Sequence, residues 1–186
     1  MKPLLKIIVI SLISISFINP CNANEILKKT SRFVESLEWD PMAHSKLNKY
    51  KENEAEYLKY IKSENEKSTY VGAIMLGLLK SKASIDTLKK IKPKTESSKV
   101  AVLFALCALK QNYKENYSKL EALGIKTQDV AGAKSIVNLD VVELLSFLGD
   151  PKFKKYASSL KSDEQFQNEA ISVAITRYEA IVKNGF

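Results

Sequence analysis

Carboxylate pairs are the residues of this sequence whose types and spacing come closest to catalytic chemistry. They are Glu38 with Asp40, Glu52 with Glu56, and Asp140 with Glu143. A spacing of three or four residues brings two carboxylates onto one face of a helix. Two carboxyl groups held across a cleft can act as general acid and nucleophile in glycoside hydrolysis. Because such spacings also arise by chance among 21 acidic residues on a solvated surface, an enzyme acting on envelope material is the alternative function rather than the main one.

Other reactive sites and cofactor sites have no support in the sequence. His44 is the only histidine, and Cys107 is the only cysteine after the first 23 residues, so no spaced Cys/His cluster exists for zinc. No Gly-x-Ser-x-Gly elbow and no glycine-rich phosphate loop is present. We therefore expect no catalytic residue, cofactor or metal. His44 is expected to be exposed or packed at a turn, and Cys107 to be a small buried apolar side chain.

The first 23 residues have the layout of a secretory signal peptide. Lys2 and Lys6 form a charged start, and an apolar run follows over residues 7–18. This run of 12 residues is shorter than the roughly 20 that span a bilayer. Small residues up to Ala23 predict cleavage after that position, so we expect export to the periplasm of a Gram-negative bacterium, or secretion. The alternative is a lipid-modified Cys21 that tethers the chain to a membrane.

An excess of lysine gives the chain its basic character. The formal charge is +8, and removal of residues 1–23 takes two lysines and leaves 27 − 21 = +6. Lysines recur in one stretch as Lys80, Lys82, Lys89, Lys90, Lys92, Lys94 and Lys99. Arginine occurs only as Arg32 and Arg177. Proteins that bind nucleic acid usually depend on arginine guanidinium groups, so we expect that this protein does not bind nucleic acid. An acidic partner protein or anionic lipid headgroups fit better, with Lys82, Lys89 and Lys90 as candidate contacts; a solvated lysine-rich surface is the other interpretation.

Aromatic residues crowd the N-terminal part of the chain. Trp39, Tyr57 and Tyr60 are candidate anchors for a partner protein, because Trp and Tyr often dominate the energy of an interface. The spacing of Tyr50, Tyr57 and Ile61 is helical, however, which favours packing of these side chains into the core. Both uses of the aromatic residues stay open at this point.

Two similar blocks follow one another between Thr69 and Leu123. Each has an apolar helix, over 70–79 or 100–109, then a polar turn and a shorter amphipathic helix, over 85–91 or 117–123. Aligning Leu79-Lys80 with Leu109-Lys110 gives a period of 30 residues, which suits two-helix repeats. Helices that are apolar nearly all round must be covered on several sides, so we expect the blocks to stack. Ser68 or Thr69, and Ser97 or Ser98, are the expected helix caps.

The flanking segments extend this all-α pattern. Helices are expected over 24–37 and 45–62, and a weaker third block places helices over 139–148 and 153–160 around Gly149-Asp150-Pro151. Gly149 can end one helix in a left-handed conformation, and Asp150-Pro151 can begin the next. A long helix over 163–184 would cap the open end. We therefore predict one all-α domain over 24–186, with a repeat-like core over about 69–160.

The third block resembles HEAT-like repeats. The run from Leu144 to Pro151, with Gly149-Asp150 in its turn, is similar to the helix-to-helix turn that this family often shows. The resemblance implies a curved solenoid of stacked helical hairpins that binds proteins and has no catalytic residues. The first two turns, over 81–84 and 111–115, lack the Gly-Asp-Pro run, so an irregular helical bundle is the other possible architecture.

Together these features predict an exported, non-enzymatic protein-interaction module. One specific form of this role, reached by analogy alone, is an immunity-type protein that neutralises a secreted toxin. The alternatives are the carboxylate-dependent envelope enzyme and the lipoprotein tethered through Cys21.

Overall fold

The fold comes from a computed structural model that describes residues 20–126, 136–160 and 165–184. Within these residues the chain forms nine α-helices and two 3-10 helices, and the remaining regular structure is one pair of two-residue strands. The prediction of an all-α fold is therefore confirmed. Residues 1–19, which make up most of the predicted signal peptide, lie outside the described residues.

The N-terminal layer contains α1 (Pro20–Ser36), η1 (Ala43–Asn53) and α2 (Glu54–Tyr60). Helix α1 begins four residues before the predicted start at Asn24, with a proline at its first position, where the missing N–H costs nothing. The single helix predicted over 45–62 is instead a 3-10 segment followed by a short α-helix. Helix α1 and η1 meet through the stacked rings of Phe33 and Tyr50, whose centroids lie 4.4 Å apart.

Two helices form the centre of the core: α3 (Glu66–Leu78) and α5 (Glu96–Ala108). Their apolar stretches are buried as predicted, with Ile74, Met75 and Ala105 completely inaccessible. A close approach between them depends on Gly77, because a Cβ at this position would lie 2.9 Å from the Cα of Ala105. Each is followed by an outer helix, α4 (Ile85–Lys90) after the 3-10 turn η2 (Lys82–Ser84), and α6 (Tyr113–Leu123).

The N-terminal ends of α3 and α5 are built alike. Asn65 and Thr95 are the caps, and their side-chain oxygens accept hydrogen bonds from the backbone N–H groups of Ser68 (3.1 Å) and Ser98 (3.2 Å). The prediction that Ser68, Thr69, Ser97 or Ser98 would cap was wrong, because both helices begin one turn earlier than their apolar stretches.

The C-terminal ends are also equivalent. Lys80 (φ 53°) follows the end of α3 and Lys110 (φ 58°) follows the end of α5, and both residues have the left-handed backbone conformation. The N–H of Ser81 donates to the carbonyl of Leu76 (2.9 Å), as the long hydrogen bond of a Schellman motif requires. Gly149 takes the same conformation after the third inner helix, with φ 63°, so the prediction for this glycine is confirmed.

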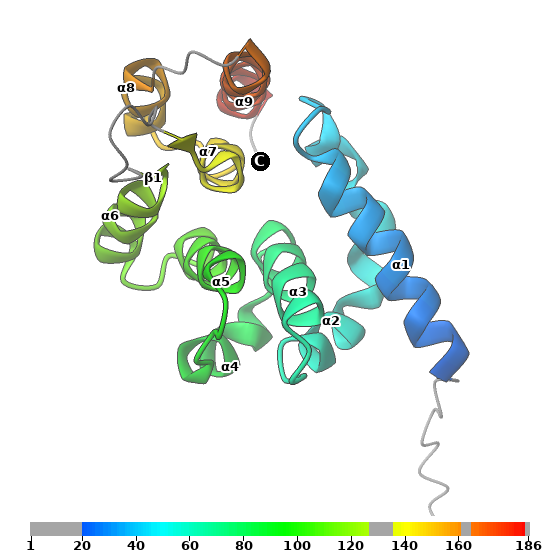
Figure 1. The fold of residues 1–186 in the computed structure, drawn as a ribbon. Helices are drawn as coiled ribbons and strands as arrows, with labels where there is room; N and C mark the ends of the chain where they lie inside the picture. The colour runs from blue at the N-terminus through cyan, green and yellow to red at the C-terminus, as the bar shows by residue number, and fades with distance from the viewer. Residues whose placement is uncertain (1–19, 127–135, 161–164, 185–186) are drawn as a thin grey trace, which may run out of the picture.

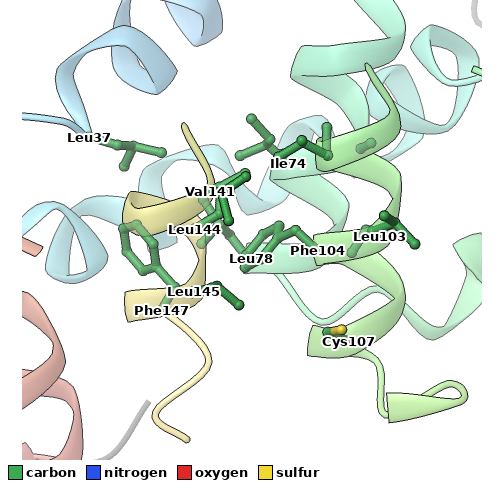
Figure 2. Packing of buried hydrophobic residues seen from close by; sticks show 14 of the residues in the cluster. Leu37, Ile74, Leu78, Leu103, Phe104, Cys107, Val141, Leu144, Leu145 and Phe147 are labelled. Atoms are coloured by element: carbon green, nitrogen blue, oxygen red, sulfur yellow. The ribbon is translucent and has the colours of Figure 1, made fainter. Parts of the chain in front are cut away.

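The C-terminal part consists of α7 (Leu139–Ser146), α8 (Lys152–Ser159) and α9 (Gln165–Asn184). Before α7, strand β1 (Ile125–Lys126) pairs antiparallel with β2 (Ile136–Val137). Figure 1 shows α3, α5 and α7 as the inner row of a curve and α4, α6 and α8 along its outside. The inner row shares one core, in which Ile74, Leu78 and Phe104 meet Val141 and Leu144 (Figure 2).

Helix α9 brings the chain back to its N-terminal layer. Its Phe166 ring packs against Trp39, with centroids 5.1 Å apart. Further along α9, the guanidinium of Arg177 donates to the backbone carbonyl of Asp40 (3.3 Å). The two ends of the curved row in Figure 1 are therefore joined by direct contacts between α9 and the segment that follows α1.

Candidate functional site

Most of the excess positive charge lies in one short stretch that surrounds α4. Residues 80–99 contain seven lysines and two acidic residues, a net charge of 7 − 2 = +5. Residues 24–186 together carry 27 − 21 = +6, so the rest of this part of the chain is close to neutral. A net charge concentrated in one stretch of the chain produces a positive electrostatic potential around it.

The fold of α4 turns its lysines toward solvent. Leu88 is buried against the core, with 1% of its surface exposed, whereas Lys89 and Lys90 next to it are exposed. Lys82, in the 3-10 turn before α4, is exposed as well. None of these three lysines takes part in the ion pairs found among the described residues. The structure therefore places all three predicted contact lysines on an accessible surface.

A groove of about 570 Å³ lies beside this surface. One wall is formed by residues 61–69, which connect α2 to the first turn of α3, and the other by residues 86–94 of α4 and the segment after it. Its apolar lining includes Ile61 and Ile91. Its ionisable lining residues are Lys62, Lys90, Lys92 and Lys94, with Glu64, Glu66 and Asp86.

Hydrogen bonds hold the two walls of the groove together. The Oε2 atom of Glu66 accepts from the backbone N–H groups of Lys94 (3.3 Å) and Thr95 (3.2 Å) and from the Thr95 hydroxyl (3.1 Å). Hydrogen bonding lowers the pKa of Glu66; the largest contribution comes from the Ser98 hydroxyl, and Thr95 contributes less. On the first wall, the hydroxyl of Thr69 donates to the carbonyl of Ser63 (3.2 Å). These hydrogen bonds join the two walls of the groove and hold the backbone of the first wall.

The predicted aromatic anchors are divided between the core and the surface. Tyr57 is completely buried and Tyr60 is 8% exposed, and the Tyr60 hydroxyl donates to the carbonyl of Ala23 (2.7 Å). Both side chains therefore pack in the core, which was the other interpretation of their spacing, and neither is accessible to a partner. Trp39 is 45% exposed, but its segment lies beside α9, at the opposite end of the molecule from α4 (Figure 1). The structure does not bring Trp39 together with the lysines.

Carboxylates from distant segments meet between α1 and α7. Asp140 and Glu143 share a face of α7, and Glu38 approaches both from the end of α1 closely enough for electrostatic repulsion. Burial, together with repulsion from Asp140, raises the pKa of Glu38. Burial raises the pKa of Glu143 to about 8; attraction to Arg177 opposes this, and repulsion from Asp140 and Glu38 adds to it. Asp140 also lines a shallow pocket of about 330 Å³ with Tyr70.

The other two carboxylate pairs serve local structure. Asp40 hydrogen-bonds to Lys46, and this contact lowers the pKa of the Asp40 carboxyl. Glu56 is 4% exposed and pairs with Lys59 at 2.7 Å, one turn along α2. Neither arrangement presents two free carboxyl groups to a substrate.

Arg177 is a buried charge that the sequence did not reveal. Its side chain is completely inaccessible, its Nη1 donates to the Ser146 hydroxyl (3.3 Å), and its guanidinium lies 4.7 Å from the ring centre of Phe147. Burial lowers its pKa, and attraction to Glu143 and then Asp40 opposes this effect. These contacts mark a structural junction between α7, α9 and the end of α1.

The remaining single-residue predictions concern His44 and Cys107. Cys107 is a free thiol and completely buried, as expected, and burial raises its pKa to about 12, so it is not a reactive thiolate. His44 is partly exposed in η1. In the described ranges no three His, Cys, Asp or Glu side chains gather in a way that could hold a metal ion. Of the helices described, none has both the length and the apolar character needed to cross a bilayer.

Comparison with known protein families and with curated proteins finds none that matches the chain. The geometry of the candidate site therefore carries the functional argument by itself.

Proposed function

We propose that this protein is an exported interaction module that binds an acidic partner protein through the lysine-rich end formed by α4. The observation that carries the proposal is the net charge of +5 in residues 80–99, whose lysines are exposed and three of which, Lys90, Lys92 and Lys94, line a groove. Lys82, Lys89 and Lys90 form no ion pair among the described residues. Exposed charges of this kind contribute little to folding, whereas they speed association with an acidic surface.

We also infer that α3 to α8 are three HEAT-like hairpins rather than an irregular bundle. The period of 30 residues between Lys80 and Lys110 coincides with their shared left-handed conformation. A second repeated contact supports this: Glu66 accepts from Thr95 at the next inner helix, and Glu96 accepts from the Asn138 side chain (3.3 Å) at the one after it. Such repeats typically present an extended binding surface.

The proposed site of action is the periplasm or the extracellular space, as the layout of residues 1–23 suggests. Neutralising a secreted toxin is the specific form of this role that we favour, by analogy. The mass of the N-terminus of the exported protein tests the processing. A chain that begins at Asn24 supports the free form, and a lipid-modified Cys21 supports the tethered form.

The experiment is capture from a periplasmic extract of the producing cells, using three forms of the tagged protein. These are the natural chain, a double charge reversal on α4 (Lys89→Glu with Lys90→Glu), and a control reversal elsewhere (Lys114→Glu with Lys155→Glu). The control lysines are exposed on α6 and α8, so both variants lose the same net charge. Only the position of the change differs.

We expect a stoichiometric acidic partner to be captured by the natural chain and by the control variant, and to be lost from the α4 variant. Equal loss from both variants would show that only total charge matters. Equal retention by both would show that α4 is not the binding surface.

A second candidate function is favoured by the carboxylates between α1 and α7. Glu143, with its pKa raised to about 8, is protonated at neutral pH and has a second acidic residue, Asp140, one turn away. Glycoside hydrolysis likewise uses two acidic side chains, one of which is a protonated acid. We would test it by incubating the protein with purified cell-wall material. Release of soluble fragments that disappears with Glu143→Gln would favour the enzyme, and no release would remove it.

A further inference from the structure

We propose that the groove between residues 61–69 and 86–94 holds an extended acidic segment of the partner, with one aliphatic side chain of that segment anchored on the groove's apolar lining. This inference rests on the proposed function and names what the lysine-rich end recognises.

The lining of the groove favours an aliphatic anchor. Ile61 and Ile91 lie on opposite walls, with Thr69 and Thr87 beside them. Ile61 and Thr69 are 2% and 3% exposed, so they form a closed base, and most of the open apolar surface comes from Ile91. Ile91 is only partly buried, so some of its apolar surface is still open to solvent in the free chain. Covering this surface with a leucine-sized side chain gains the free energy of apolar burial.

The rim of the groove favours carboxylates next to that anchor. Lys90, Lys92 and Lys94 recur at every second position where the chain leaves α4 and becomes extended at Ile91. Lys62 lies across from them on the first wall, and all four ammonium groups belong to exposed residues. A segment lying between these walls would meet lysine side chains from both, and the lining as a whole has a net charge of 4 − 3 = +1.

The three acidic residues of the lining offset most of its charge and restrict where the carboxylates of such a segment can lie. The Glu66 carboxylate keeps its negative charge, but its Oε2 atom is directed at the backbone and hydroxyl of the opposite wall and not at the open groove. Glu64 and Asp86 remain at the rim, where they would repel a segment that placed a carboxylate beside them. The lining therefore favours an acidic segment whose carboxylates lie beside the lysines and away from Glu64 and Asp86. A nucleic acid carries a negative charge at every phosphate and cannot leave such gaps, so the lining favours a protein segment.

The test uses fluorescein-labelled acidic peptides that are identical except for one central residue, leucine in one peptide and serine in the other. Binding to the full chain is followed by fluorescence anisotropy. The natural protein should bind the leucine peptide about tenfold more tightly than the serine peptide, the ratio expected for burial of one aliphatic side chain. A single-stranded oligonucleotide serves as the competing polyanion.

Variants of the protein separate the contribution of the groove to binding from the contribution of the lysines. Thr87→Trp fills the groove without changing charge, and Thr87→Ser is its conservative control. Thr87→Trp should abolish the preference for leucine, and Thr87→Ser should keep it. Lys89→Glu with Lys90→Glu should weaken binding of both peptides by a similar factor and keep the preference. Thermal melting confirms that each variant is folded.

The outcomes distinguish the two proposals. If the lysine reversal weakens binding but the natural protein does not prefer leucine over serine, the groove proposal is overturned and the proposed function stands. The same holds if the oligonucleotide displaces the peptide at equal charge concentration. If neither peptide binds in a way that depends on Lys89 and Lys90, the proposed function fails as well.

Discussion

The two ends of this molecule use charge in opposite ways. Around α4, lysines stand on the surface, and Lys82, Lys89 and Lys90 form no ion pair among the described residues. At the junction of α1, α7 and α9, by contrast, Arg177 is completely buried and the pKa of Glu143 is raised to about 8 by burial.

We interpret the exposed charge around α4 as available for binding and the buried charge at the junction as part of the fold. A buried charge has a large desolvation cost, so it must be satisfied by its neighbours, and removing a neighbour damages the structure. An exposed charge stays hydrated and contributes little to stability, so it is available for binding. We therefore expect mutations at the junction to change stability and mutations around α4 to change binding.

Arg177→Ala should have the largest effect on stability. It removes the guanidinium from the Phe147 ring and leaves the Ser146 hydroxyl and the Asp40 carbonyl without this donor. We expect a loss of about 3 kcal/mol or more in the free energy of unfolding, measured with urea. Arg32 is the matched control, because it is exposed. Arg32→Ala should stay within about 0.5 kcal/mol, and equal losses for the two variants would contradict the comparison.

Glu143→Gln should reveal the pH dependence of the junction. The carboxyl has a pKa of about 8 in the folded chain against 4.5 as its ordinary value, so the fold favours the protonated form. Its contribution to stability is complete below about pH 4.5 and is lost as the pH rises through about 8. Above pH 8 the Glu143→Gln variant should be more stable than the natural chain by about 1–3 kcal/mol, and near pH 4 the difference should be small.

Urea unfolding at the two pH values measures this difference. Glu115→Gln is the control, because Glu115 is exposed and its ion pair with Lys119 lowers its pKa, which is the opposite direction. If the advantage of the Glu143→Gln variant did not grow with pH, the pKa of Glu143 in the folded chain would have to lie near its ordinary value of 4.5, and the burial argument would be wrong.

The smallest effect on stability is expected around α4. Replacing Lys82, Lys89 and Lys90 together with glutamine should change the free energy of unfolding by no more than about 0.5 kcal/mol, because these side chains are exposed. Thermal melting at low and high salt checks this. A large loss of stability would mean that the lysines belong to the fold and would weaken the case for recognition.

Much of the fold could be predicted from local pattern. The apolar stretches of α3 and α5 and the left-handed Gly149 follow directly from residue type, and the structure confirms them. The left-handed Lys80 and Lys110 could not be predicted in this way, since a lysine is sterically disfavoured there and glycine is the usual choice. The helix caps were placed too late because Asn65 and Thr95 precede the apolar runs that defined each helix.

The candidate site was predictable only in part. The outward position of Lys89 and Lys90 follows from the apolar spacing of α4, but the groove beside them depends on how residues 61–69 pack against 86–94. The approach of Glu38 to Asp140 joins the segment after α1 to α7, which lies about 100 residues further along the chain, and no local pattern predicts such a contact. The burial of Tyr57 likewise depends on tertiary packing.

Amide hydrogen exchange on the free protein and on its complex with the captured partner tests the central claim most directly. The account predicts that binding slows exchange in residues 61–69 and 86–94, along the groove and α4. Slowing confined to the opposite end, in the segment around Trp39 and at the start of α9, would contradict it.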